Sequence, residues 1–154
     1  MPPSDLGTIT YNESLSAPAV DGIISWVEEP LLDALHGLVY AKMGDQCLRR
    51  LVDFRSWPDG WSNGEGNAVA LPTLRNLQQF VQEAHWVTAR PPSLFLTKSG
   101  GLEILVRTSL GRRLQVVLVP DGIEYFFEPT QEEGFAEATD INSVAAKFSR
   151  LALS

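Results

Sequence analysis

The feature that most constrains the fold is the recurrence of apolar residues at every second position in the stretch 94–127. The alternation occurs in four short runs, which are separated by Gly-Gly, Gly and Pro-Asp-Gly. A period of two places the apolar side chains on one face of a strand, and closely spaced turn residues join neighbouring strands antiparallel. The stretch therefore predicts a four-stranded antiparallel meander with one buried face. The inward-facing residues are Leu94 and Leu96, then Leu102, Ile104 and Val106, then Leu114, Val116 and Leu118, then Ile123, Tyr125 and Phe127.

Helices must cover that buried face, and the remaining apolar residues recur at steps of three and four. Glu28, Glu29 and Pro30 are typical of a helix start, because acids favour the positive end of the helix dipole and proline fits the first turn. The fold class expected is α+β, in which an N-terminal helical hairpin and a third helix pack on the meander and a C-terminal helix follows. The helices are expected at about 28–44, 45–56, 71–86 and 140–151.

The length of 154 residues fits one domain, which we expect to span residues 23–154. Residues 1–22 mix proline and glycine with short apolar pieces and are interpreted as a mobile or loosely docked arm. Cys47 is the only cysteine, which excludes an intramolecular disulfide and a cysteine-based zinc site. The chain has no long uncharged apolar run and no export signal, so we expect a cytoplasmic protein.

The loop 57–66, W-P-D-G-W-S-N-G-E-G, separates the helical half from the strand-rich half. Trp57 and Trp61 can form an exposed aromatic platform for a partner, but such residues more often anchor a loop in the core. Asp59, Asn63 and Glu65 do not follow the ligand order of an EF-hand, so they are interpreted as turn residues and no metal is expected.

A wider pattern joins this loop to the following helix and the hairpin turns across residues 45–128. Its residues are Asp59, Gly60, Trp61, Gly64, Gly66, Pro72, Gly100, Gly101, Glu103, Asp121 and Gly122. The layout resembles a family of small bacterial and phage-associated proteins with a D-G-W-x-x-x-G-x-G-like loop before a helix and an antiparallel sheet. The chain departs from it at Ile104, where such proteins often have tryptophan. The resemblance implies an accessory or mobile-element protein, among which antitoxins, immunity proteins and defence inhibitors would be expected, and no established activity.

The charge of -7 is unevenly distributed along the chain. Residues 1–33 and 124–140 each contain six acids and no base, whereas residues 34–123 contain ten bases and seven acids. Direct nucleic-acid binding requires clustered Lys and Arg, so a basic protein or nucleoprotein surface is the expected partner. The alternative is that the acids only keep the domain soluble. Residues 129–134 are predicted as an acidic loop, with Phe135 and Ala136 as an edge pairing, and the candidate partner-binding residues are Glu128, Glu132, Glu133, Glu137, Asp140, Trp57 and Trp61.

The chain lacks the serine-hydrolase, zinc-protease, P-loop and dinucleotide-binding motifs. Cys47 lies on an apolar helical stripe and is interpreted as a small buried hydrophobe. The function expected is a non-enzymatic, cofactor-free inhibitor or neutraliser of the antitoxin, immunity or anti-defence type. The alternatives are a structural protein that forms a homodimer and a small enzyme that uses His36 or His85.

Overall fold

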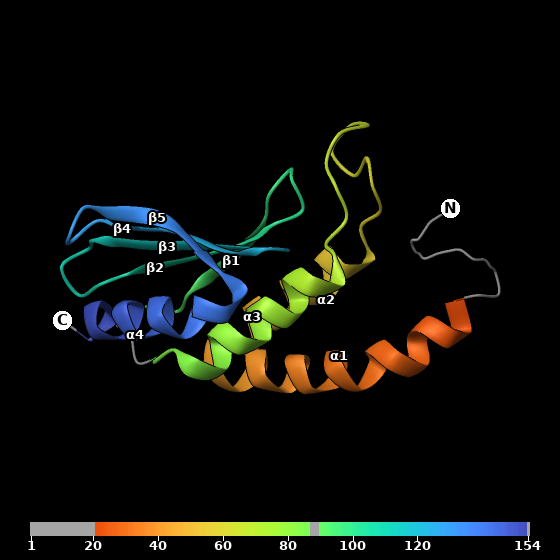
Figure 1. Ribbon diagram of the computed structural model, residues 1–154, viewed down its shortest axis with the longest axis horizontal. Coiled ribbons are helices and arrows are strands. Elements are labelled where there is room, and N and C mark those ends of the chain that lie inside the picture. The colour runs from red at the N-terminus through yellow and green to blue at the C-terminus, as the bar shows by residue number, and fades with distance from the viewer. Residues whose placement is uncertain (1–20, 87–89, 154) are drawn as a thin grey trace. The chain divides into compact units, whose positions relative to one another are not determined.

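The computed structural model describes residues 21–86 and 90–153, and side chains from Pro30 onwards (Figure 1). The predicted arm, residues 1–22, lies almost entirely outside the described residues. The chain divides into two units, 1–35 and 36–154, and the whole sheet belongs to the second. The elements are α1 (Asp21–Met43), α2 (Asp45–Ser56), α3 (Leu71–Glu83), β1 (Ser93–Leu96), β2 (Leu102–Arg107), β3 (Arg113–Val119), β4 (Gly122–Phe127), β5 (Glu132–Glu137), the 3-10 turn η2 (Ala138–Asp140) and α4 (Ile141–Ala152).

The predicted α+β class and antiparallel meander are confirmed. The strands form one sheet in the order β1-β2-β3-β4-β5, and each pairs antiparallel with the next. Helices α3 and α4 pack on the same face of this sheet, and α2 packs beside β1 (Figure 1). The core between them contains the aromatic cluster Phe80, Trp86, Phe127 and Phe148, whose neighbouring rings lie 5.1 to 6.5 Å apart. The alternating residues predicted to face inward are fully buried in β2 and β3.

The predicted strand count was wrong, because residues 132–137 form a fifth strand. The edge pairing expected at Phe135 and Ala136 is confirmed, but the strand begins at Glu132, inside the predicted loop 129–134. Glu, Gly and Ala have low strand propensity, so this segment shows no strand pattern of its own. Its strand conformation comes from pairing with β4, from Gly122 opposite Glu137 to Phe127 opposite Glu132. The Tyr125 ring lies close to Gly134, where a Cβ would be only 3.0 Å from the phenol oxygen. A glycine covered by a cross-strand aromatic ring is therefore part of how this edge strand packs.

The predicted start of the first helix was also wrong, because α1 begins at Asp21 and contains Pro30 in its interior. Ile24 and Val27 continue, upstream of the proline, the helical spacing that Leu31 begins downstream of it. A proline inside a helix loses one backbone hydrogen bond, but the periodicity on both sides of it favours a continuous helix.

Candidate functional site

The sheet has a second face, opposite α3 and α4, which no helix of the described part of the 36–154 unit covers (Figure 1). We call it the open face. The pairing registers place a single row of side chains across all five strands. Such rows are in contact because directly opposite residues have Cβ atoms about 5 Å apart. The row consists of Phe95, Glu103, Val117, Glu124 and Phe135.

A second row runs beside the first and contains Leu105, Gln115, Phe126 and Glu133. Large apolar side chains thus occupy positions on both rows, and Phe135 remains 51% exposed. An open groove of about 580 Å³ lies over β3, β4 and β5 between these side chains. It is lined by Arg113, Gln115, Val117, Glu124, Tyr125, Phe126, Glu133, Gly134 and Phe135.

The charges of the open face are separated along the strands. Arg107 and Arg113 are paired at one end of β2 and β3, and the Arg113 guanidinium lies over the Phe126 ring, 5.1 Å from its centroid. Glu124 on β4 and Glu133 on β5 line the groove, and Glu137 lies further along β5 on the same face. None of these three carboxylates takes part in an ion pair within the described residues. The groove therefore combines exposed aromatic surface with two carboxylates, Glu124 and Glu133, and one base, Arg113, which forms no ion pair with either of them within the described residues.

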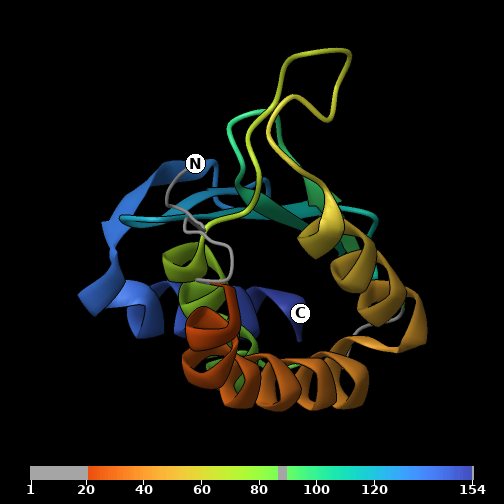
Figure 2. The same cartoon turned by 90° about the vertical axis from the view of Figure 1, so that its right-hand side faces the viewer.

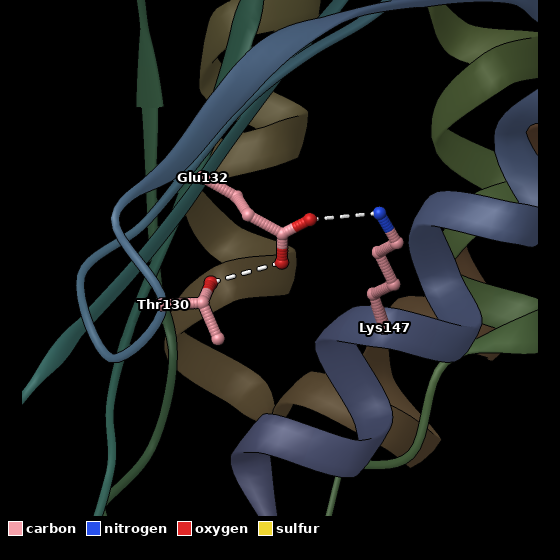
Figure 3. A network of polar contacts seen from close by, with 3 residues as sticks. All are labelled: Thr130, Glu132 and Lys147. Carbon is pink, nitrogen blue, oxygen red and sulfur yellow. Dashed lines mark hydrogen bonds and ion pairs between the residues drawn. The ribbon is translucent and has the colours of Figure 1, made fainter.

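The structure separates the acidic residues that the sequence grouped together. Glu133 and Glu137 lie on the open face, whereas Glu132 faces α4 and binds Lys147 at 2.9 Å and Thr130 at 2.9 Å (Figure 3). The hydrogen bond from Lys147 lowers the pKa of the Glu132 carboxyl, and the same bond raises the pKa of Lys147. Alternation in β5 is the cause, since neighbouring residues of a strand point to opposite faces.

The remaining two predicted acids have other surroundings. Glu128 Oε1 accepts a hydrogen bond of 2.7 Å from the backbone N–H of Arg113 and so closes the end of the β3–β4 pair. Asp140 is exposed next to the first turn of α4, where a negative charge interacts favourably with the positive end of the helix dipole. The five predicted carboxylates therefore do not form one patch. In the first acidic stretch, every acid except Asp33 lies outside the described side chains.

Trp57 and Trp61 form a separate aromatic surface on the α2–α3 loop, with ring centroids 5.2 Å apart. Trp57 is 36% exposed and contacts the buried Phe54 edge-on, so its ring is partly anchored on the core and partly accessible. A groove of about 470 Å³ lies against the two rings, which supports the platform interpretation. The groove is lined by Trp57, Pro58, Trp61, Ser62 and Asn63.

The loop that carries the tryptophans is held by specific backbone contacts. Trp61 Nε1 donates to the Asn67 carbonyl at 2.9 Å, and Asp59 Oδ1 accepts from the Ala68 N–H at 2.8 Å. The β1–β2 turn lies beside the loop, where Asn67 N–H donates to the Lys98 carbonyl and Lys98 pairs with Glu65 (Figure 2). Asp59 therefore has the turn role that the sequence predicted.

The two histidines are in different surroundings. Arg55 Nη1 donates to His36 Nε2 at 2.8 Å, since a guanidinium can only donate. His85 is exposed in a groove of about 430 Å³ that Glu83 also lines. Cys47 is buried, its Sγ–H donates to the Pro92 carbonyl, and burial raises the pKa of the thiol. Among the residues described, no group of three His, Cys, Asp or Glu side chains is placed to hold a metal ion.

The open face itself was not predicted from the sequence. Phe126 is at an alternate position that was expected to face solvent, and Phe135 was expected only as part of an edge pairing. The available signal was their apolar character, because a solvated sheet face normally carries polar residues. Leu105 and Val117 give the same signal on β2 and β3.

No protein-family model, curated protein or solved structure compared with the chain matches it. The resemblance across residues 45–128 therefore stays a prediction. None of the helices in residues 21–86 and 90–153 has the length and apolar character needed to cross a membrane.

Proposed function

We propose that this protein is a non-enzymatic protein-binding inhibitor or neutraliser that covers a basic surface of its partner with the open face of its sheet. The observation that carries the proposal is the groove over β3, β4 and β5, where aromatic rings are combined with the carboxylates of Glu124 and Glu133, and Glu137 follows on the same face of β5. Antitoxin, immunity and anti-defence proteins are the classes that the sequence pattern favours.

Apolar and charged groups on the open face would contribute to partner binding in different ways. Aromatic side chains supply most of the binding energy at protein interfaces, and Phe126 and Phe135 are available for this on the groove. Carboxylates around them speed the encounter with a basic partner and disfavour acidic ones. A partner that uses its basic surface to bind phosphate groups would be blocked when this face covers it.

The proposal is tested by a double charge reversal, Glu133→Lys with Glu137→Lys, in affinity capture from the native source. The matched control is Asp53→Lys with Glu83→Lys, which changes the net charge equally at exposed sites near the ends of α2 and α3. The proteins retained by the β5 variant and by the control variant are each quantified relative to those retained by the unaltered chain. We expect the β5 variant to lose proteins that the control retains.

The retained proteins should also have basic surfaces, and their capture should weaken as salt rises, because exposed charges are screened within about 10 Å at 0.1 M salt. Capture of the same proteins in the same amounts by the β5 variant would refute the proposal. Equal losses in both variants would refute it as well, since the effect would then depend on net charge and not on the open face.

A further inference from the structure

The open face is small for a protein interface. Five strands about 4.8 Å apart and about 20 Å long give roughly 500 Å² in projection, against about 800 Å² per partner in a standard interface. A partner that binds this face would gain contact area by also covering one of its edges. The two edges of the sheet are β1 and β5.

The β1 edge is occupied by α2. The Leu94 carbonyl accepts a hydrogen bond of 3.0 Å from Arg50 Nη1, and the Pro92 carbonyl before the strand accepts one from Cys47 Sγ–H. The Arg50 guanidinium also lies over the Phe95 ring, 5.1 Å from its centroid. Side chains of α2 thus take up the carbonyl groups that a further strand would need.

Among the described residues, none covers the β5 edge in a comparable way. Ala138 N–H donates to the Asp121 carbonyl, which fixes the hydrogen-bonding pattern of the β4–β5 pair. Because bonded pairs alternate along antiparallel strands, Ala136, Gly134 and Glu132 bond inward to β4. The backbone groups of Glu133, Phe135 and Glu137 point outward, and no described residue hydrogen-bonds to them.

The same residues that present a free backbone also present their side chains on the open face. A strand added to β5 would place alternate residues opposite Glu133, Phe135 and Glu137. Opposite charges stabilise such cross-strand pairs, and like charges in the same position destabilise them. An added strand fits this edge when its residues opposite Glu133, Phe135 and Glu137 are basic, apolar and basic, respectively.

We propose that the β5 edge binds an extended basic segment of the partner protein as a sixth strand. The inference rests on the proposed function and specifies how the partner is recognised. Main-chain hydrogen bonds supply affinity in this kind of strand addition, and the alternate side chains supply specificity.

A second copy of the chain does not fit the same edge. When two β5 strands pair antiparallel about Phe135 with their helices on the same side, Glu133 of each copy lies opposite Glu137 of the other. These acids therefore prevent self-association of an exposed edge strand while they select a basic one.

The test uses the full chain and the peptide Thr-Lys-Thr-Val-Thr-Lys-Thr as a probe of the proposed segment. Solvent exchange of backbone amides is measured by NMR as peptide is added. We expect the amides of Glu133, Phe135 and Glu137 to exchange about tenfold more slowly at saturation, because they become hydrogen-bonded. The amides of Gly134 and Ala136 already bond to β4 and should not change.

Two further peptides provide controls of the same length. A peptide with the same residues in the order Lys-Lys-Thr-Thr-Val-Thr-Thr should bind about tenfold more weakly, because it cannot place lysines opposite both acids. A peptide with glutamate at the two lysine positions should bind only to the Glu133→Lys, Glu137→Lys variant. Equal binding of the alternating and rearranged lysine peptides would overturn the inference.

Substitutions at Phe135 separate edge binding from face binding. Phe135→Pro removes an outward backbone donor without removing a β4–β5 hydrogen bond, and proline is tolerated at such edge positions. Phe135→Ala removes the ring but keeps the donor. Binding of the peptide should be lost in the proline variant and only weakened in the alanine variant.

The two proposals can fail separately. If capture of basic proteins depends on Glu133 and Glu137 but is equal for Phe135→Pro and Phe135→Ala, the edge inference is wrong while the proposed function stands. If the peptide shifts only open-face residues such as Val117 and Phe126, without slower exchange at the β5 amides, the edge inference is again wrong.

Discussion

Asn76 connects helix α3 to the turn between β3 and β4. Its side chain is 6% exposed, and Nδ2 donates to the carbonyls of Val119 at 2.8 Å and Pro120 at 3.2 Å. One amide group therefore satisfies two carbonyls at the end of the central hairpin of the sheet. The substitution Asn76→Asp keeps the shape of the side chain but replaces the donor with an oxygen, so it tests this connection directly.

The expected destabilisation follows from the two contacts. Each lost hydrogen bond contributes about 1 kcal/mol, and a buried carboxylate that faces two carbonyl oxygens is left without a partner. Breaking a buried polar pair in this way typically costs about 3 kcal/mol or more. We therefore expect Asn76→Asp to lower the free energy of unfolding by about 3 kcal/mol near neutral pH.

The loss should depend on pH with a defined sign. Burial and the facing carbonyls raise the pKa of the introduced carboxyl in the folded state above its unfolded value of about 3.9. The protonated form can donate to one carbonyl, so the penalty is smallest below the unfolded pKa. It grows as pH rises toward the folded pKa, by about 1.4 kcal/mol for each unit.

Urea unfolding followed by tryptophan fluorescence measures this penalty. The difference in unfolding free energy between Asn76→Asp and the unaltered chain should be about 1 to 2 kcal/mol larger near pH 7.5 than near pH 4.5. Asn142→Asp is the matched control, because Asn142 is exposed in the first turn of α4 and its Oδ1 already accepts from Gln79. That control should change stability by no more than about 1 kcal/mol and in the stabilising direction. A penalty for Asn76→Asp that is small, or that does not vary with pH, would refute the role of the amide.

Three further outcomes are expected. Lys147→Met should raise the pKa of Glu132 toward its ordinary value in an NMR titration, because the Lys147 hydrogen bond lowers it. The Glu132–Lys147 pair stabilises the folded state at pH values above the ordinary carboxyl pKa, and this stabilisation is lost as pH falls through the lowered pKa. Cys47, which is 2% exposed and has a raised pKa, should react with a thiol reagent at least about tenfold more slowly in the native protein than in urea, and equal rates would contradict its burial. Gly66→Ala should destabilise the protein by about 1 to 2 kcal/mol and alter the Trp61 fluorescence, because Gly66 has a φ of 92° and an added Cβ would lie 2.7 Å from the indole; an unchanged spectrum would count against this packing.

The parts of the fold that could be predicted from the sequence are those where burial dictates the pattern. Ile104 and Val116 alternate with less buried residues because one face of β2 and β3 packs on helices, and the alternation is visible without coordinates. The turn at Asp121 and Gly122 was visible for the same reason that it forms, since glycine and aspartate favour tight turns. Strand β5 was found only in part, as an edge pairing at Phe135 and Ala136, because most of its residues are small or charged and its conformation depends on pairing with β4.

The candidate site was only partly predictable. Its composition is visible in the sequence, but the face of the sheet on which each side chain of β5 lies is not. Glu132 and Glu133 are equivalent as adjacent acids, yet one binds Lys147 on the helical side and the other lies beside the groove. A shift of one residue in the β4–β5 register would exchange them. The register follows from the turn 128–131, in which Gln131 has a φ of 57°, and from pairing that starts at Phe127 opposite Glu132. Counting acids therefore finds the charge of this segment, whereas the length and geometry of one short turn decide which carboxylates a partner meets.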